Sequence, residues 1–219
     1  MTRYVKKEEI NDSIIKEISL ALKDGKLVVF PTDTVYGIGT NAYNGDACER
    51  IYEVKGRPPY KPLVLLISDI SMLEELVDCI GLVEQKLIDS FWPGALTIKM
   101  KKKKGVLPDV ISAGDEYLRA RLVSKGVVYE LIKKAGVPVV APSANLSGSL
   151  TGTKMDNIMK ELDGKVDYIL DYGDIESDAT STIVEVIDGK VVIIREGKIT
   201  KEELAKVVPL QIENSNDEF

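Results

Sequence analysis

Two hydroxyl groups and a carboxylate follow a short apolar run near the start of the chain. The run covers residues 27–30, and the polar side chains are those of Thr32, Asp33 and Thr34. In α/β proteins the carboxyl ends of strands form the edge at which ligands bind, so this segment is a candidate binding loop. A turn that is stabilised by its own Thr and Asp side chains explains the same residues equally well. The segment alone leaves both interpretations open.

Three cations follow in a segment whose backbone is restricted by glycine and proline. Lys55, Arg57 and Lys61 stand with Gly56 and three prolines within residues 54–62. Such a backbone would hold the cations in a fixed arc, which suits a triphosphate because the charges need not reorganise during phosphoryl transfer. A single cation near a helix C-terminus more often satisfies the helix dipole and solvent, but the prolines favour the functional interpretation.

A second apolar run delivers small polar side chains into a loop. Residues 137–141 precede Ser143 and Asn145, and the loop ends at Gly148. Small side chains here would let backbone N–H groups approach a phosphate or an adenine closely, while an ordinary Ser/Asn turn is the alternative.

Two arginines alternate with apolar residues in a predicted strand. Arg119 and Arg121 lie two positions apart in residues 118–122, so both project from one face of that strand. Paired arginines on a strand face are usually solvated unless an anionic ligand lies over them.

The composition excludes several kinds of chemistry. The chain has no histidine, which rules out Ser-His-Asp and Cys-His catalysis, and its two cysteines, Cys48 and Cys79, lie too far apart for a common zinc motif. An enzyme built from this chain must therefore work by positioning and charge, or by carboxylate, lysine or tyrosine chemistry. No metal-binding residues are expected.

With 29 basic and 35 acidic residues and a net charge of −6, the chain is not expected to bind tRNA or other RNA tightly, although its local basic clusters suffice for a nucleotide.

The surrounding pattern predicts an α/β domain over residues 1–209. Helical periodicity appears around residues 14–22, 47–54 and 128–135, and capping boxes are predicted at Ser71 with Glu74 and at Thr200 with Glu203. An Asp188-Gly189 turn predicts a late hairpin, which would make the sheet mixed. The predicted strands cover residues 27–30, 63–67, 96–100, 118–122, 137–141, 168–170, 182–186 and 191–194.

The two ends of the chain lead to separate expectations. Residues 210–219 form a polar, acidic C-terminal tail that we expect to fray. No apolar run approaches the roughly 20 residues that a membrane helix needs, and residues 1–10 lack a signal-peptide core, so a cytoplasmic location without membrane contact is expected.

No common ATP signature is present, since both the Walker-type and the kinase-type glycine loops are missing. The order of segments nevertheless resembles the YrdC-like family of threonylcarbamoyl-AMP synthases in its short, single-domain form, over nearly the whole chain. The matching segments are Pro-Thr-Asp-Thr-Val-Tyr-Gly at 31–37, Lys-Gly-Arg-Pro at 55–58, Lys-Pro-Leu at 61–63, Phe-Trp-Pro-Gly-Ala-Leu-Thr at 91–97, Arg-Ala-Arg at 119–121, Ala-Pro-Ser-Ala-Asn-Leu-Ser-Gly at 141–148, Ser-Thr-Ile-Val at 181–184 and Arg-Glu-Gly at 195–197.

The resemblance implies a twisted, mixed open sheet flanked by helices, with a concave and positively charged cavity. It also implies that L-threonine, bicarbonate and ATP with Mg²⁺ are converted to threonylcarbamoyl-AMP and pyrophosphate, and that the product passes to a tRNA threonylcarbamoyltransferase complex for tRNA modification. By the same motifs, Lys55 and Arg57 would act in catalysis. Threonine would contact Thr34, Leu66, Arg121 and Ser181. ATP would contact Arg57, Lys61, Tyr117, Ala141, Ser143, Asn145, Thr151 and Arg195.

Four positions depart from the usual family pattern. Leu66 stands where many members have histidine, Lys61 where asparagine is common, Tyr117 where threonine is common, and Glu196 where proline is frequent. Two alternative functions fit the same cavity. One is a non-catalytic RNA- or nucleotide-binding module. The other is the carbamoyl transfer of hydrogenase-maturation enzymes, which is disfavoured because that chemistry uses additional domains.

Overall fold

A computed structural model describes residues 1–148, 152–176 and 179–210. Its helices are η1, a 3-10 helix (Lys7–Glu9), α1 (Asp12–Lys23), α2 (Gly45–Lys55), α3 (Ile70–Leu76), α4 (Leu82–Phe91), α5 (Asp109–Ser112), α6 (Val127–Ala135), α7 (Met155–Leu162) and α8 (Lys201–Ala205). Its strands are β1 (Arg3–Lys6), β2 (Val28–Phe30), β3 (Gly37–Asn41), β4 (Val64–Ile67), β5 (Leu96–Lys101), β6 (Tyr117–Leu122), β7 (Val139–Val140), β8 (Tyr168–Asp171), β9 (Thr182–Ile187) and β10 (Lys190–Arg195).

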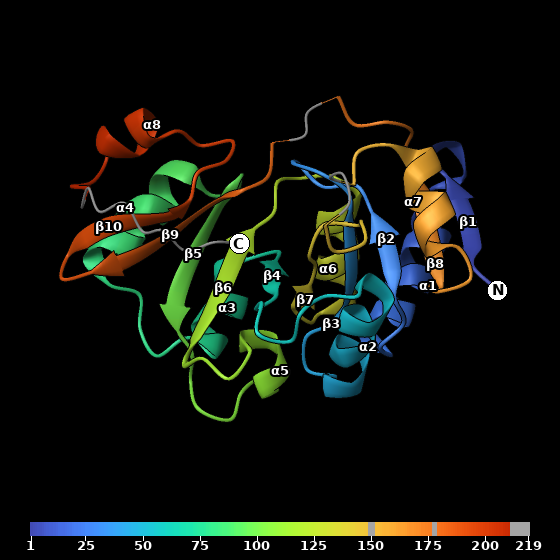
Figure 1. Cartoon of the computed structure of the whole chain (residues 1–219), viewed down its shortest axis with the longest axis horizontal. Coiled ribbons are helices and arrows are strands. Elements are labelled where there is room, and N and C mark those ends of the chain that lie inside the picture. The colour runs from blue at the N-terminus through green and yellow to red at the C-terminus, as the bar shows by residue number, and fades with distance from the viewer. Residues whose placement is uncertain (149–151, 177–178, 211–219) are drawn as a thin grey trace.

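The strands form one twisted, mixed sheet in the order β1-β8-β2-β3-β7-β4-β6-β5-β9-β10 (Figure 1). β8 runs parallel to β1 and β2, β4 runs parallel to β6, and β5 runs parallel to β9, while the other neighbouring pairs are antiparallel. The predicted late hairpin is confirmed, because β9 and β10 pair antiparallel around Asp188 and Gly189, whose φ values of 50° and 73° suit a tight hairpin turn. The mixed α/β class predicted from the sequence is therefore confirmed.

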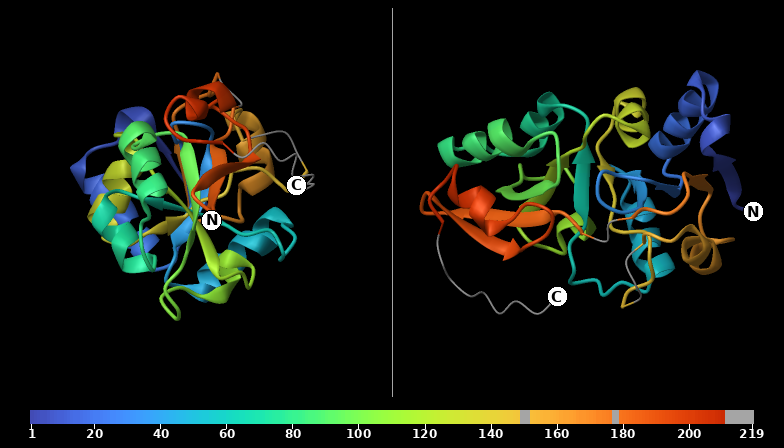
Figure 2. Two further views of the ribbon diagram at one scale, coloured as in Figure 1. Left: turned by 90° about the vertical axis from the view of Figure 1, so that its left-hand side faces the viewer. Right: turned by 90° about the horizontal axis from the view of Figure 1, so that it is seen from above.

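Helices cover both faces of this sheet (Figure 2). α1 and α6 share one buried apolar cluster with β2 and β7, in which Ile18 and Leu131 are fully buried. α2, α3, α4 and α7 contribute to a second and larger cluster, which includes Ile51, Leu73 and Leu162. These two clusters hold the strands, and hence the loops at their ends, in fixed positions. Within the described part of the chain, no helix is long and apolar enough to cross a membrane.

Several boundaries differ from those expected. The helix predicted to be capped by Ser71 is capped instead by Asp69, whose carboxylate accepts a hydrogen bond from the Met72 N–H at 3.1 Å. The helix begins earlier because the Asp69 carboxylate caps it, and the Ser71 hydroxyl donates to that carboxylate instead of capping the helix itself. The capping box at Thr200 and Glu203 is confirmed. Of the predicted tail, only Leu210 lies within the described residues, where it forms a parallel bridge with Val191.

Two strands, β1 and β3, were not predicted. β3 contains Gly37 and Gly39, which disfavour strands, yet it pairs with both β2 and β7. A Cβ atom at Gly39 would lie 2.6 Å from Cζ of Phe30 and 2.8 Å from Cγ1 of Val139. The glycine is therefore required by the close packing of β2 and β7 side chains over β3.

The register of β4 and β6 decides which side chains share a face. Val64 pairs with Arg119 and Leu66 pairs with Arg121, so all four side chains project from one face of the sheet. The chain later leaves β8, second from one edge of the sheet, and enters β9, next to the opposite edge, so its connection crosses between the two halves (Figure 1).

Candidate functional site

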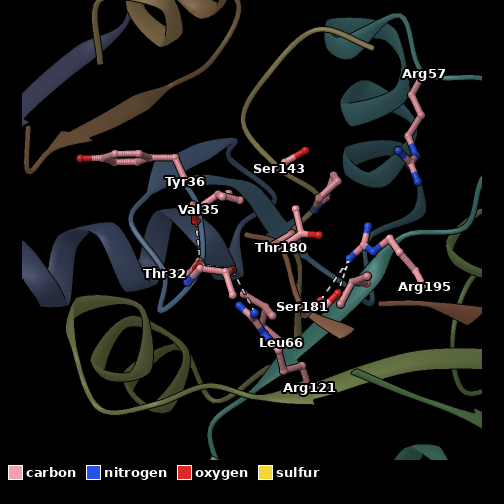
Figure 3. Close-up of a pocket in the computed structure, with 15 residues that line it drawn as sticks. Thr32, Val35, Tyr36, Arg57, Leu66, Arg121, Ser143, Thr180, Ser181 and Arg195 are labelled. Carbon is pink, nitrogen blue, oxygen red and sulfur yellow. Dashed lines mark hydrogen bonds between the residues drawn. The ribbon is translucent and has the colours of Figure 1, made fainter. Parts of the chain in front are cut away.

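A cavity of about 600 Å³, including its open mouth, lies where the loops after β2 and β7 face β4 and β6. Three arginines contribute to its wall, and no Asp or Glu does so among the described residues. Figure 3 shows hydroxyl, apolar and guanidinium side chains from separate parts of the chain around this space. The lining residues are Thr32, Thr34, Val35, Tyr36, Gly37, Arg57, Val64, Leu66, Arg121, Ala141, Pro142, Ser143, Thr180, Ser181 and Arg195.

The loop after β2 is a turn held by its own side chains and is also part of the cavity wall. The Thr32 hydroxyl accepts from the Thr34 N–H at 3.1 Å and donates to the Val35 carbonyl at 2.6 Å. Its oxygen lies 3.0 Å from Oγ1 of Thr34. The turn interpretation is therefore confirmed, and the same hydrogen bonds hold two hydroxyls at the cavity wall, where the binding interpretation stays a prediction.

Arg121 connects this loop to β6. Its Nη1 donates to Oγ1 of Thr34 at 3.0 Å, and its Nη2 lies 3.1 Å from Oδ1 of Asp33. Burial lowers the pKa of Arg121 and the carboxylate of Asp33 opposes that effect, so the guanidinium stays charged. Within the described part of the chain, Nε of Arg121 is buried without a hydrogen-bond partner, and the buried Oδ1 of Asp33 makes only the ion pair. Arg121 is therefore a buried cation held in one orientation beside a hydroxyl.

Arg195, at the end of β10, lines another part of the cavity. Its Nη2 donates to the Ser181 carbonyl at 2.7 Å and to the Ser181 hydroxyl at 3.3 Å, and that hydroxyl also accepts from Thr97 at 2.9 Å. Burial, followed by the nearby charges of Arg119, Arg121 and Arg57, lowers the pKa of Arg195 to about 10. The guanidinium is still protonated at neutral pH, in a field that favours an anion.

Arg57 is held by the proline-rich segment that carries it. Its Nε donates to the Lys61 carbonyl at 3.1 Å and its Nη2 to the Pro62 carbonyl at 2.8 Å. Burial lowers the pKa of Arg57, and the Arg119 charge adds to that effect. The arc of three cations expected from the sequence is not found at the cavity: of Lys55, Arg57 and Lys61 only Arg57 lines it, and Lys61 contributes its backbone carbonyl as an acceptor for Arg57.

Lys55 does not line the cavity, and its side chain bonds to the loop after β7. Its ammonium donates to the carbonyl oxygens of Ser143 and Asn145, and its side chain is almost fully buried. Burial, followed by the Arg57 charge, lowers the pKa of Lys55 to about 7, while Glu161 acts in the opposite direction. The Ser147 N–H returns a hydrogen bond to the Lys55 carbonyl at 2.8 Å. Lys55 therefore positions the loop that presents Ser143.

The Ser143 loop is joined to β3 as well. Gly37 and Ser143 form an antiparallel bridge, and the Ala144 N–H donates to the Tyr36 carbonyl at 2.7 Å. The Ser143 hydroxyl donates to the Asn145 side chain at 2.5 Å. Burial raises the pKa of Tyr36 to about 12, and its hydroxyl donates to the Gly173 carbonyl at 2.8 Å, so Tyr36 is a neutral structural wall residue.

Most of the site residues proposed from the sequence gather at this cavity. Those that line it are Thr34, Arg57, Leu66, Arg121, Ala141, Ser143, Ser181 and Arg195. Those that do not are Lys55, Lys61, Tyr117 and Asn145. Thr151 lies outside the described residues. The Tyr117 ring lies instead under the Lys99 ammonium, 4.7 Å from it.

Sequence reasoning did not assign seven lining residues, which are Thr32, Val35, Tyr36, Gly37, Val64, Pro142 and Thr180. All but Val64 and Thr180 lie within motifs already singled out, so motif membership was the available signal. Val64 could have been identified from the strand register, which places it beside Arg119.

The arrangement is suited to binding anions and a small polar molecule. Besides hydroxyls and guanidiniums, the lining includes the apolar side chains of Val35, Val64, Leu66 and Ala141. Among the described residues, no group of three or more carboxylate, thiol or imidazole side chains is placed to hold a metal ion.

The family model and the curated relatives that match this chain agree on one family. The Sua5/YciO/YrdC family model, described as "Telomere recombination", matches residues 20–197. The chain is 39% identical over 204 residues to the threonylcarbamoyl-AMP synthase of Bacillus subtilis, covering 93% of this chain and 59% of that protein. A Methanocaldococcus jannaschii relative is 36% identical over 203 residues, covering 93% of this chain and 95% of that protein.

A solved structure leads to the same family. The Sua5 protein of Pyrococcus abyssi in complex with L-threonine superposes with a TM-score of 0.88 at 33% identity, over 96% of this chain and 62% of that one. The chain thus spans about three fifths of the length of the B. subtilis and P. abyssi proteins. With a family model that matches most of its length and relatives above 30% identity, the chain belongs to the Sua5/YciO/YrdC family.

Proposed function

We propose that this chain is an L-threonylcarbamoyladenylate synthase, a nucleotidyltransferase. The amine of L-threonine attacks the carbon of bicarbonate, a C–O bond of bicarbonate breaks and water leaves. An oxygen of the resulting carbamate then attacks the α-phosphate of ATP. The bond from that phosphorus to the bridging oxygen breaks, and pyrophosphate leaves with the electron pair. The observation that carries the proposal is one cavity in which the Arg121–Thr34 pair lies with Arg57, Arg195 and Ser143.

Support for the amino-acid end comes from Arg121, Thr34 and Ser181. A buried guanidinium suits a carboxylate, and a neighbouring hydroxyl that already accepts from that guanidinium suits a hydroxylated side chain. Leu66 offers an apolar surface for the methyl group of threonine. The name of the B. subtilis relative and the threonine complex of the P. abyssi relative are consistent with this choice of substrate.

Support for the ATP end comes from Arg57, Arg195 and Ser143. The two guanidiniums are oriented by neutral carbonyl and hydroxyl oxygens, so their charge remains available to phosphate oxygens. We propose that Mg²⁺ enters with ATP and is held by phosphate oxygens, since no carboxylate is among the described lining residues.

The proposed chemistry needs no protein nucleophile. The carbamate is itself the nucleophile, which agrees with a chain that contains no histidine. Arg57 and Arg195 would meet the charge that develops on the α-phosphate and its leaving group, while Arg121 orients threonine and Lys55 holds the Ser143 loop. Fixed cations of this kind act without reorganising during the reaction.

The product is a mixed anhydride that reacts readily with water and amines, so we propose transfer to a tRNA threonylcarbamoyltransferase complex, with weak or no direct tRNA binding by this acidic chain. We propose the cytoplasm as its location, because ATP and tRNA are available there.

The test is mass spectrometry after the protein is mixed with ATP, Mg²⁺, L-threonine and bicarbonate. We expect threonylcarbamoyl-adenylate and an equal amount of pyrophosphate, and Arg57→Ala and Ser143→Ala should lose most of both. Pyrophosphate release that does not depend on threonine and bicarbonate would end the proposal. Salt-sensitive RNA binding without turnover would favour the binding-module alternative.

A further inference from the structure

Arg119 lies at the border of the cavity but is not part of its wall. Its register partner Val64 is a lining residue, and Arg121, two positions along β6, is another. Because alternate residues of a strand share a face and lie about 7 Å apart, Arg119 continues the row that Arg121 begins. On the neighbouring strand its partner is Lys99. Arg119 therefore lies next to the cavity on the same face of the sheet.

The electrostatic surroundings also place Arg119 near two lining cations. Burial is the main cause of the lowered pKa of Arg57 and of Arg195, and the Arg119 charge contributes in the same direction to both. Arg119 thus acts on two guanidiniums that reach the cavity from separate parts of the chain. The ammonium of Lys99, the partner of Arg119 on β5, lies 3.2 Å from a carboxylate oxygen of Glu185 and 3.5 Å from one of Asp115.

The balance of charge around the cavity suggests the kind of ligand. Arg121 faces Asp33, and in the proposed reaction it also meets the threonine carboxylate. Arg57 and Arg195 donate to neutral carbonyl and hydroxyl oxygens. The negative charge of one α-phosphate is smaller than the combined positive charge of Arg57, Arg195 and Arg119. Gathered cations of this kind are stabilised by a polyanion that bridges them.

We propose that Arg119 binds the pyrophosphate portion of ATP, together with Arg57 and Arg195, as the leaving-group site of the proposed reaction. This inference rests on the proposed function for its chemistry, while the binding itself can be measured without turnover. As the bond between the α-phosphorus and the bridging oxygen breaks, the electron pair and negative charge move onto pyrophosphate. A fixed guanidinium at that end stabilises this charge and retains the product until release.

The experiment compares binding of Mg²⁺-pyrophosphate and of AMP, by titration calorimetry, to the wild type, Arg119→Gln and Arg119→Lys. The control is Arg50→Gln, because Arg50 is an exposed arginine of α2 whose ion-pair partner is Asp167 at 3.5 Å. Arg119→Gln should weaken pyrophosphate binding at least tenfold and change AMP binding less than twofold. Arg119→Lys should lose less, since it keeps the charge without the planar fork. Arg50→Gln should match the wild type.

The outcomes separate this inference from the proposed function. Unchanged pyrophosphate binding in Arg119→Gln, or an equal loss of AMP binding, would overturn the inference. If Arg119→Gln does not fold, the Arg119→Lys protein decides: pyrophosphate binding weakened with AMP binding retained supports the site, and affinities equal to the wild type for both overturn it. A wild type that binds pyrophosphate through Arg119 but forms no threonylcarbamoyl-adenylate would contradict the proposed activity and leave the binding site in place.

Discussion

Nη1 of Arg121 donates a hydrogen bond to Oγ1 of Thr34 across 3.0 Å, and both side chains are buried. This bond joins the loop after β2 to the end of β6, and the two residues are separated by 87 positions in the sequence. The loop is fixed on its other side by the Thr32 hydroxyl. The Thr34 oxygen is therefore presented to the cavity in one orientation, before any ligand binds.

Replacing Thr34 with valine should raise the KM for threonine about tenfold or more, because a hydrogen bond to a charged donor contributes about 1.5–3 kcal/mol. The KM for ATP should change little. Both constants are measured by pyrophosphate release. Thr40→Val is the matched control, since the Thr40 hydroxyl is buried in β3 without a hydrogen-bond partner and outside the cavity lining. Equal effects of Thr34→Val on both substrates would contradict a specific threonine contact.

Lys55 should make stability depend on pH above neutrality. Its pKa is about 7 in the folded protein, against 10.5 for an ordinary lysine, so between these values the unfolded chain binds more protons and stability rises with pH. Between pH 7 and pH 9 the wild type should gain on the order of 2 kcal/mol over Lys55→Met in its free energy of unfolding. Urea denaturation at several pH values measures this difference.

The difference in stability between the wild type and Lys55→Met isolates the titration of Lys55, because the other titrating groups are common to both proteins. Burial raises the pKa of Cys48 and of Tyr36 to about 12, and both groups are present in the wild type and in Lys55→Met. Lys16→Met, at an exposed position of α1, should follow the wild-type pH profile. A constant difference between the wild type and Lys55→Met from pH 7 to pH 9 would show that Lys55 keeps its full charge in the fold.

Gly39→Ala should destabilise the protein by about 1–3 kcal/mol, the usual cost of overpacking a core. The added Cβ would lie within 2.8 Å of carbon atoms in Phe30 and Val139, neither of which is free to move. Gly45→Ala is the matched control, because the nearest atom to its added Cβ lies 3.5 Å away. Chemical denaturation reports both values, and equal stability of the two variants would refute the close packing around β3.

The sequence predicted some strands of the sheet, such as β6, and not others, namely β1 and β3. The alternation in residues 118–122 identified β6, because one face is buried and the other carries arginines. β3 escaped prediction because Gly37 and Gly39 have low strand propensity, and only its neighbours in the sheet make it a strand. β1 is short and mostly exposed, so its sequence has little apolar signal.

The sequence predicted which residues lie at the candidate site better than it predicted what each of them does. The order of the motifs predicted that Thr34, Arg121, Ser143 and Arg195 share one site. In the structure these four residues line one cavity. The role of Lys55 could not be inferred, because its two acceptors are backbone carbonyls about ninety positions away. Backbone acceptors leave no trace in residue types, so only the folded chain identifies them.

Because the chain crosses the sheet between β8 and β9, the cavity is lined by residues from two distant portions of the sheet. Thr34 and Ser143 belong to loops near the middle of the sheet, whereas Ser181 and Arg195 come from the β9–β10 end that this connection reaches. A molecule that touches both groups is a non-covalent crosslink between distant portions of the sheet, and its binding energy opposes the separation of either portion from the rest. A ligand in the cavity therefore couples the unfolding of the middle of the sheet to the unfolding of its β9–β10 end.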